Sequence, residues 1–365
     1  MMKSNFMDTL LDGVEVEWTL IGDKRFVEIA NSNRKPVKAS LRKLGKTPYF
    51  GANNIQDYVE GYTHDGVFIL IAEDGSASLE NYSIQWATGQ FWANNHVHVL
   101  RSTGGLDNRF LYHYLKNVSF IPFLSGGARA KLTKSKLVEI PIPIPPLRVQ
   151  EEIVRILDTF TELTAELTAE LTARNKQYNY YREQLLTFEE GEVEWKKIKD
   201  VAKIKNGKDW KMLGAGDIPV YGSGGIMNYV DKFAYDKPTV LIPRKGSITN
   251  IFYVETPIWN VDTIYYTEID INQLIPKFFY HYMKTIDLMK LDTGSGRPSL
   301  TQAILNEIKI PIPSLEEQDR IVSILDKFDT LTTSITEGLP REIELRQKQY
   351  EYYRNMLLSF PKEVV

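Results

Sequence analysis

The sequence predicts an α+β protein in which two globular α/β parts are separated and joined by two long helices. The helices are expected to form an antiparallel coiled coil, and the chain to carry a pseudo-two-fold internal repeat. Three observations support this fold class. Much of the first half of the chain returns in the second half, two segments carry a long apolar stripe at helical spacing, and short apolar runs ending in turn residues fill the stretches between them.

The 365-residue chain contains an internal duplication, with shifts that drift from 168 to 172 residues because of short insertions. The matched segments are IPIPPLRVQEEIVRILDTF (142–160) with IPIPSLEEQDRIVSILDKF (310–328), RFLYHYL (109–115) with KFFYHYM (277–283), GARAKLT (127–133) with SGRPSLT (295–301), LIAEDGS (70–76) with LIPRKGS (241–247), and RNKQYNYYREQLLTF (174–188) with RQKQYEYYRNMLLSF (346–360). Each half therefore consists of one globular part and one helical arm.

Five domains follow from this repeat. They are an N-terminal helical stub (1–13) that completes the second helical region, a first globular domain (14–146), a central helical region (147–190), a second globular domain (191–313) and a C-terminal helical region (314–365). The two globular domains carry net charges of +3 and +2, and the two arms −4 and −3. We expect the basic domains to meet phosphates and the acidic arms to meet protein.

The arms are predicted to be helices because apolar residues recur every three or four positions. A helix of about 40 residues is roughly 60 Å long and cannot bury its stripe alone, so each arm should cover the other. The residues expected to pair the helices and dock partners are Ile153, Leu157, Phe160, Leu163, Leu167 and Leu171 in the first arm, and Ile321, Leu325, Phe328 and Leu331 in the second.

Glycine and proline predict where regular structure stops. In the second arm, EGLPREI should break or kink the helix, since Gly338 can end one helix and Pro340 is tolerated at the start of the next. The IPIP segments (140–146 and 308–313) should be extended linkers. In the globular domains GVFILIAEDG, PTVLIPRKG, TPYFGANN and IPVYGSGG predict strands, and NRFLYHYLKN and PKFFYHYMKT predict helices.

Composition excludes several classes of protein. The chain has no cysteine, hence no disulfide, thiol catalyst or cysteine–zinc site, which fits a cytoplasmic protein. No apolar run approaches the roughly 18 residues of a membrane helix, and the N-terminus lacks a signal-peptide core, so no membrane partner is expected.

Catalytic motifs are missing as well. There is no P-loop, no H-E-x-x-H metal motif, no G-x-S-x-G elbow and no N/D-P-P-Y/F motif. His113 and His281 are expected to be packed rather than catalytic, and His96 and His98 are only a weak metal signal. The sequence predicts a protein that binds without catalysis of its own and needs no metal or cofactor.

The duplicated arms, the repeated Thr-Ala-Glu-Leu unit within residues 163–174 (the TAEL repeat), EGLPREIELRQKQYEYYRNMLLSF and the segments VLIPRKGS and DTGSGRPSL together resemble the specificity subunit of type I restriction–modification enzymes. The resemblance implies that the globular domains are target-recognition domains, each reading one half of a bipartite site in double-stranded DNA. It also implies that the paired helices dock two methyltransferase subunits, which carry S-adenosylmethionine and methylate adenine, and that motor-nuclease subunits complete the complex. Two alternatives remain at this point: the specificity subunit of a fused type II system, and a coiled-coil scaffold with ligand-binding heads.

DNA-contacting residues are predicted from their type and from their place on loops, because asparagine suits adenine, arginine suits guanine and cations suit phosphates. They are Asn53, Asn54, Asn94, Asn95, Arg129 and Lys131 in the first domain, and Lys208, Trp210, Arg244, Lys245 and Arg297 in the second. Asn53 and Asn54 would alternatively hold a turn, and the matched pair Arg129 and Arg297 would alternatively contact phosphate or hold the fold.

The stretch LTAELTAELTAR (163–174) repeats a four-residue unit inside the first arm. Each copy adds roughly 6 Å of helix and turns the stripe by about 40°. In proteins of the family that the chain resembles, copy number is linked to the length of the DNA spacer between the half-sites. We therefore interpret the repeat as a helical spacer.

Overall fold

The computed structural model describes residues 7, 9–126, 130–189, 191–294, 296–334 and 336–361. The chain folds into two compact units, residues 1–166 with 343–365 (unit 1) and residues 167–342 (unit 2), and each is described by itself. The unit boundaries fall inside helices, so the five domain boundaries drawn from the sequence stay a prediction. In the part of the chain described, no helix is long and apolar enough to cross a membrane.

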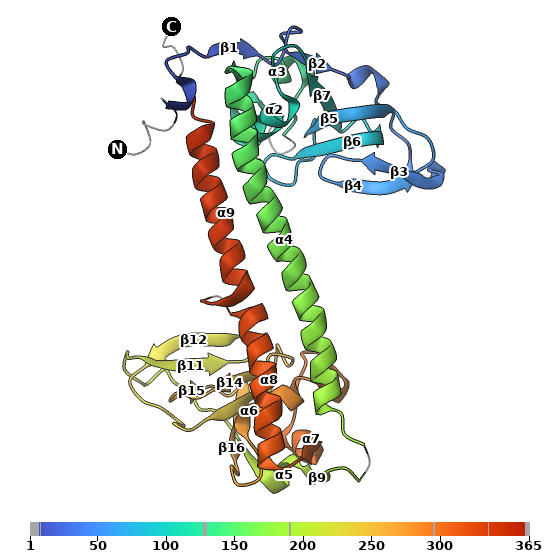
Figure 1. The fold of residues 1–365 in the computed structure, drawn as a ribbon. Coiled ribbons are helices and arrows are strands. Elements are labelled where there is room, and N and C mark those ends of the chain that lie inside the picture. The colour runs from blue at the N-terminus through green and yellow to red at the C-terminus, as the bar shows by residue number, and fades with distance from the viewer. Residues whose placement is uncertain are drawn as a thin grey trace. The chain divides into compact units, whose positions relative to one another are not determined.

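Unit 1 is built on a six-stranded sheet whose strands lie in the order β2-β7-β5-β6-β3-β4 (Figure 1). All neighbours are antiparallel except β3 and β6, which run parallel. The strands are β2 (Val27–Ile29), β3 (Leu44–Phe50), β4 (Ile55–Val59), β5 (His64–Ala72), β6 (Ile84–Ala93) and β7 (Val97–Ser102). The predicted strands GVFILIAEDG and TPYFGANN are thus β5 and β3.

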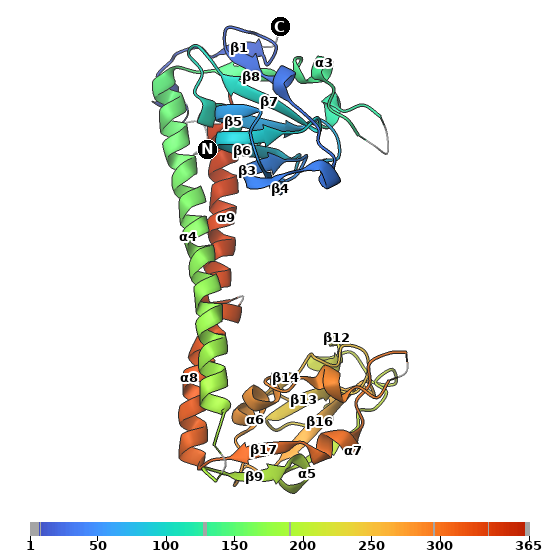
Figure 2. The ribbon, with the colours of Figure 1, turned by 90° about the vertical axis from the view of Figure 1, so that its right-hand side faces the viewer.

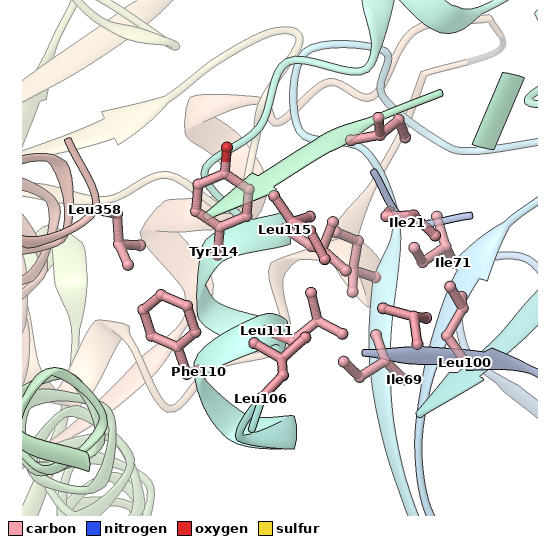
Figure 3. Packing of buried hydrophobic residues seen from close by; sticks show 14 of the residues in the cluster. Ile21, Ile69, Ile71, Leu100, Leu106, Phe110, Leu111, Tyr114, Leu115 and Leu358 are labelled. Atoms are coloured by element: carbon pink, nitrogen blue, oxygen red, sulfur yellow. The ribbon is translucent and has the colours of Figure 1, made fainter. Parts of the chain in front are cut away.

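The core of unit 1 lies between this sheet and helix α2 (Asn108–Leu115). The carboxylate of Asp107 caps the helix by accepting a 2.7 Å bond from the Phe110 amide. Figure 3 shows Leu111 and Leu115 of α2 directed toward Ile69 and Leu100 of the sheet. Short helices α3 (Lys134–Leu137), η1 (Asn31–Asn33), η2 (Ala39–Leu41) and η3 (Ile121–Phe123) complete the loops of this unit.

Unit 2 repeats the plan with a divided sheet, which has four strands in the order β10-β16-β13-β14 and three in the order β12-β11-β15. Its elements are β10 (Ala202–Lys205), β11 (Ile218–Gly222), β12 (Gly225–Val230), β13 (Thr239–Pro243), β14 (Phe252–Val254), β15 (Trp259–Asn260), β16 (Ile264–Ile269), α5 (Ile198–Val201), α6 (Pro276–Met283), η4 (Leu288–Leu291) and α7 (Gln302–Glu307). Helix α6 is the predicted counterpart of α2, and β13 and β11 are the predicted counterparts of β5 and β3.

The arms are helical, as their periodicity predicts. The first is a single helix, α4 (Leu147–Leu186), and the second consists of α8 (Leu315–Thr333) and α9 (Gly338–Leu357) (Figure 2). The predicted break between α8 and α9 is confirmed. Gly338 has φ +81°, a backbone conformation that favours glycine, and Pro340 lies in the first turn of α9, where its missing N–H costs nothing.

Antiparallel helix pairing occurs within each unit. In unit 1, Ile153 and Leu157 of α4 are fully buried in the same core as Leu357 of α9, and Phe160 stacks on Tyr353 with ring centroids 5.2 Å apart.

In unit 2, Ile321 and Leu325 of α8 are fully buried, and Phe328 stacks on Tyr181 of α4 at 5.5 Å. The other four stripe residues, Leu163, Leu167, Leu171 and Leu331, are half-buried.

The helical stub in unit 1 joins the end of the second arm. Met7 and Leu11 are buried in the cluster that holds Leu357 and Leu358, and the Trp18 indole N–H donates to the Pro361 carbonyl at 2.9 Å. Residues 1–6 and 8 of the predicted stub lie outside the described residues.

Each arm begins with a buried glutamine that makes an equivalent set of hydrogen bonds to the globular part of its unit. The side chain of Gln150, fully buried, accepts from the Asp107 amide at 2.7 Å and donates to the carbonyls of Gly105 and Pro145. Gln318, 168 residues later, makes the matching three bonds with Ile275, Gln273 and Pro313. A long helix is thereby fixed at its start to the globular part of its own unit.

The IPIP segments differ from the prediction in one respect. They are extended, but they are strands rather than linkers: β8 (Pro141–Ile144) pairs with β1 (Glu17–Leu20), and β17 (Lys309–Ile312) pairs with β9 (Glu194–Lys197). Two-stranded pairing suits proline, because its missing N–H can face away from the partner strand.

Candidate nucleic-acid interface

Two cations of unit 2, Lys245 and Arg297, lie at one surface, and Arg244 is the neighbour of Lys245 in the chain. Lys245 and Arg297 line a concavity of about 480 Å³ together with Ser223 and Thr263. Lys245 and Arg297 are exposed, and Arg244 is half-buried. None of the three forms an ion pair with a described residue; the only polar contact of the Arg244 head is to the Asp262 carbonyl at 3.4 Å. Unpaired cations at a concave surface are free to bind an anion.

Main-chain bonds hold these cations in place. The amide of Arg244 donates to the Thr263 carbonyl at 2.8 Å, and Lys245 forms an isolated bridge with Ser299. The loop that carries Arg297 is closed by Asp292, whose Oδ1 accepts from the amides of Gly294 and Ser299 at 2.7 Å each. These two bonds lower the pKa of the Asp292 carboxyl, so the loop is locked by an ionised side chain.

Lys208 and Trp210 lie on a different loop of unit 2. Lys208 is exposed, while Trp210 is half-buried against Val220, Val230 and Val261. Trp210 therefore belongs partly to the fold, and Lys208 presents its charge to solvent.

The place of Arg244 and Lys245 is taken in unit 1 by Glu73 and Asp74, since LIAEDGS matches LIPRKGS. Glu73 pairs with Arg34 at 2.6 Å and with Lys131 at 3.0 Å. Burial opposes ionisation of Glu73, but the bonds from Arg34 and Lys131 outweigh it and lower the pKa of this carboxyl. Lys131, predicted to contact DNA, is thus already neutralised within unit 1.

Of the four predicted asparagines of unit 1, two have side chains engaged in the fold and the other two are exposed. Asn53 donates to the Gly75 carbonyl and accepts from the Ala77 amide, both at 2.8 Å, so its side chain holds a turn as the alternative interpretation had it. Asn94 is 3% exposed and accepts from the His96 amide, which turns it away from any base and removes it from the residues that could read DNA. Asn54 and Asn95 are exposed. Arg129 lies outside the described residues.

Sequence reasoning missed a basic segment of unit 1. Residues 34–46, RKPVKASLRKLGK, carry six cations and no acid, and join β2 to β3. The signal was the density of charge, which a net charge of +3 for the whole domain conceals.

His113 and His281 are packed in the cores of the two units, as predicted, and each holds one arm helix. Each donates from Nε2 to an aspartate of an arm helix, His113 to Asp158 of α4 at 2.8 Å and His281 to Asp326 of α8 at 3.0 Å. Within the described ranges no group of three or more His, Cys, Asp or Glu side chains is placed to hold a metal ion.

Comparison with known proteins decides the family. Residues 15–174 and 190–345 match the family model described as "Type I restriction modification DNA specificity domain". The chain belongs to this family. As a type I specificity subunit it serves in DNA recognition within a restriction–modification complex, and the resemblance inferred from the sequence is confirmed.

Relatives of this specificity subunit match along almost the whole chain. A putative type I restriction enzyme specificity subunit of Haemophilus influenzae is 51% identical over 387 residues, covering 98% of this chain and 100% of the relative. A type I restriction enzyme specificity subunit of Escherichia coli is 34% identical, covering 99% and 98%. The crystal structure of a type I S subunit from M. genitalium has the same fold, with a TM-score of 0.68 at 21% identity and coverage of 96% and 98%.

Proposed function

We propose that each unit of this specificity subunit reads one half of a bipartite site in double-stranded DNA, with a spacer between the halves. The observation that carries the proposal is the charge difference at equivalent places. Unit 2 has Arg244 and Lys245, neither in an ion pair with a described residue, where unit 1 has Glu73, paired with Arg34 and Lys131, and Asp74, paired with His96. A guanidinium or ammonium suits the acceptors of guanine, and a carboxylate suits the amino group of cytosine, so the two surfaces suit different sequences.

The rest of the complex is proposed on the family. Two methyltransferase subunits would dock on the paired helices α4, α8 and α9, supply S-adenosylmethionine and methylate adenine, and motor-nuclease subunits would join them in the cytoplasm. This chain would add no catalytic group. The acidic balance of both arms, −4 and −3, supports docking of protein rather than DNA on the helices.

The test is to co-express the chain with its methyltransferase and map methylated adenines by single-molecule sequencing. We expect a bipartite motif. Replacing Arg244→Ala together with Lys245→Ala should change or abolish one half-site and leave the other intact. Lys290→Ala, an exposed lysine of unit 2 that pairs with Asp287, is the control and should change neither. A continuous methylated site contradicts the proposal. If the double variant methylates the same motif as the wild type, Arg244 and Lys245 do not take part in recognition.

A further inference from the structure

A lysine is held by a tryptophan in the same way in both units. In unit 1 the Lys35 amide donates to the Ala93 carbonyl at 3.0 Å, and the Lys35 carbonyl accepts from the Trp92 indole N–H at 2.7 Å. In unit 2 the Lys208 amide donates to the Asn260 carbonyl at 2.9 Å, and its carbonyl accepts from the Trp259 indole at 3.0 Å.

The two arrangements occupy equivalent places in the sheets. Trp92 is the parallel partner of Tyr49 on β3, and Trp259 is the parallel partner of Val220 on β11, where β3 and β11 are the matched strands TPYFG and IPVYG. Lys35 and Lys208 are therefore counterparts. They lie 173 residues apart in the chain.

Each tryptophan clamps the backbone of a lysine and leaves its side chain exposed. Both anchors fix the loop that runs into the matched strand. In unit 1 this loop is the basic segment 34–46. Its two arginines are engaged, Arg34 with Glu73 and Arg42 with Asp57 and over the Tyr49 ring at 4.1 Å.

The lysines of this loop are not engaged. Lys35, Lys38, Lys43 and Lys46 are exposed, and none pairs with a carboxylate of a described residue. Lys35 and Lys43 lie at the rim of a concavity of about 210 Å³ that is lined by Tyr49 and Trp92. In unit 2 the corresponding loop carries exposed Lys208 and Lys211, together with exposed Asp209 and Asp217, so it is not a block of uncompensated charge and only its anchored Lys208 matches unit 1. In unit 1, four uncompensated charges within twelve residues repel one another, so an anionic partner stabilises the loop.

We propose that these tryptophan-anchored loops bind the phosphate backbone of DNA, with Lys35 and Lys208 as equivalent contacts in the two units. The proposal rests on the proposed function, that the units bind DNA, and adds which surface positions the duplex. Ammonium groups are point charges suited to phosphate, and phosphate contacts fix register without reading sequence. The tryptophan–lysine contact is the same in both units, whereas the residues at positions 73 and 244 differ in charge. A contact that is shared by two units reading different sequences suits phosphate, which is the same in every sequence.

The test measures how DNA affinity of the assembled specificity–methyltransferase complex depends on salt. Each phosphate contact contributes about 0.9 to the slope of log affinity against log salt. We expect Lys35→Ala with Lys43→Ala to reduce the slope by about 2 and to weaken binding on the order of tenfold, with the methylated motif unchanged. Lys208→Ala should reduce the slope by about 1.

The matched control is Lys134→Ala with Lys136→Ala on α3, which removes the same charge from a part of unit 1 away from β3 and β4 (Figures 1 and 2). It should leave the slope unchanged. Trp92→Phe keeps the ring but removes the N–H that holds Lys35, so it should lower the slope while the thermal unfolding midpoint stays within a few degrees.

Two results would overturn the inference. If the salt dependence of DNA affinity is unchanged in the Lys35 and Lys43 variant, these lysines do not contact phosphate. If the methylated motif is altered, the loop reads bases instead. Either result leaves the proposed function standing, because that function fails only if the wild-type complex methylates no bipartite motif.

Discussion

His113 and His281 lie at matched places in the two cores, each 1% exposed. Burial lowers the pKa of both imidazoles, and the hydrogen bonds to Asp158 and Asp326 offset this only in part. Both rings are therefore neutral in the folded protein at pH 7 and resist protonation below it. Their role is to fix α4 to α2 and α8 to α6, each through one hydrogen bond from a neutral imidazole to an aspartate in the body of the arm helix.

This environment predicts a pH dependence of stability. The folded pKa is depressed, so the stability contributed by each histidine is fully present above its unfolded pKa of about 6.5. It is lost as the pH falls toward the folded value, by at most about 1.4 kcal/mol per pH unit and histidine. Urea unfolding at pH 7.5 and 5.5 should show this loss in the wild type and a smaller one in His113→Gln or His281→Gln. An equal loss in the variants would contradict it.

At the scale of elements, the break in the second arm depends on Gly338. A Cβ atom at this position would lie 2.5 Å from the Thr330 carbonyl oxygen and 2.8 Å from that of Leu331. These are backbone atoms of the last turn of α8, which cannot move aside without unwinding that turn. The glycine therefore allows both a left-handed φ and a close approach.

We expect Gly338→Ala to lower the free energy of unfolding of unit 2 by at least about 2 kcal/mol. Gly191→Ala is the matched control in the same unit. Gly191 has φ +90°, but no heavy atom within 4 Å of the added Cβ, so it should cost only about 1 kcal/mol. Urea unfolding of the two variants measures the difference. Equal costs would mean that the close approach to α8 has no energetic weight.

Sequence reasoning found the elements that are regular and repeated. The apolar stripe of α4, the helices α2 and α6 at matched positions of the repeat, and the break at Gly338 follow from local periodicity and backbone chemistry. It missed the pairing of β8 with β1 and the Trp92–Lys35 contact, because both join segments far apart in the chain. For the candidate interface it supplied residue types on loops. It could not show that Asn94 is buried or that Lys131 is paired with Glu73, since those facts depend on tertiary packing.

At the scale of the whole molecule, the boundary between the two compact units in the chain, between Glu166 and Leu167 of α4, falls inside the TAEL repeat (163–174). The helix is continuous through this point, and its two ends are packed in different units. Its length is therefore a property that neither unit determines.

Deleting Thr168–Leu171 should shorten α4 by about 6 Å and turn its far end by about 40°. Under the proposed function we expect a DNA spacer shorter by one or two base pairs, at about 3.4 Å each, with both half-sites unchanged. Mapping of methylated adenines measures both. The length-preserving variant Glu166→Gln with Glu170→Gln should keep the wild-type spacer. An unchanged spacer after deletion, or an altered half-site, would contradict this.

The bond from Trp18 to the Pro361 carbonyl bears on how the protein is made. Unit 1 needs residues 343–361 to cover Met7, Leu11 and the start of α4, whereas every residue of unit 2 lies between its two pieces. A ribosome completes domains from the N-terminus onward. Here the unit that begins first finishes last, so an unfinished unit 1 waits with part of its core exposed to water while unit 2 folds.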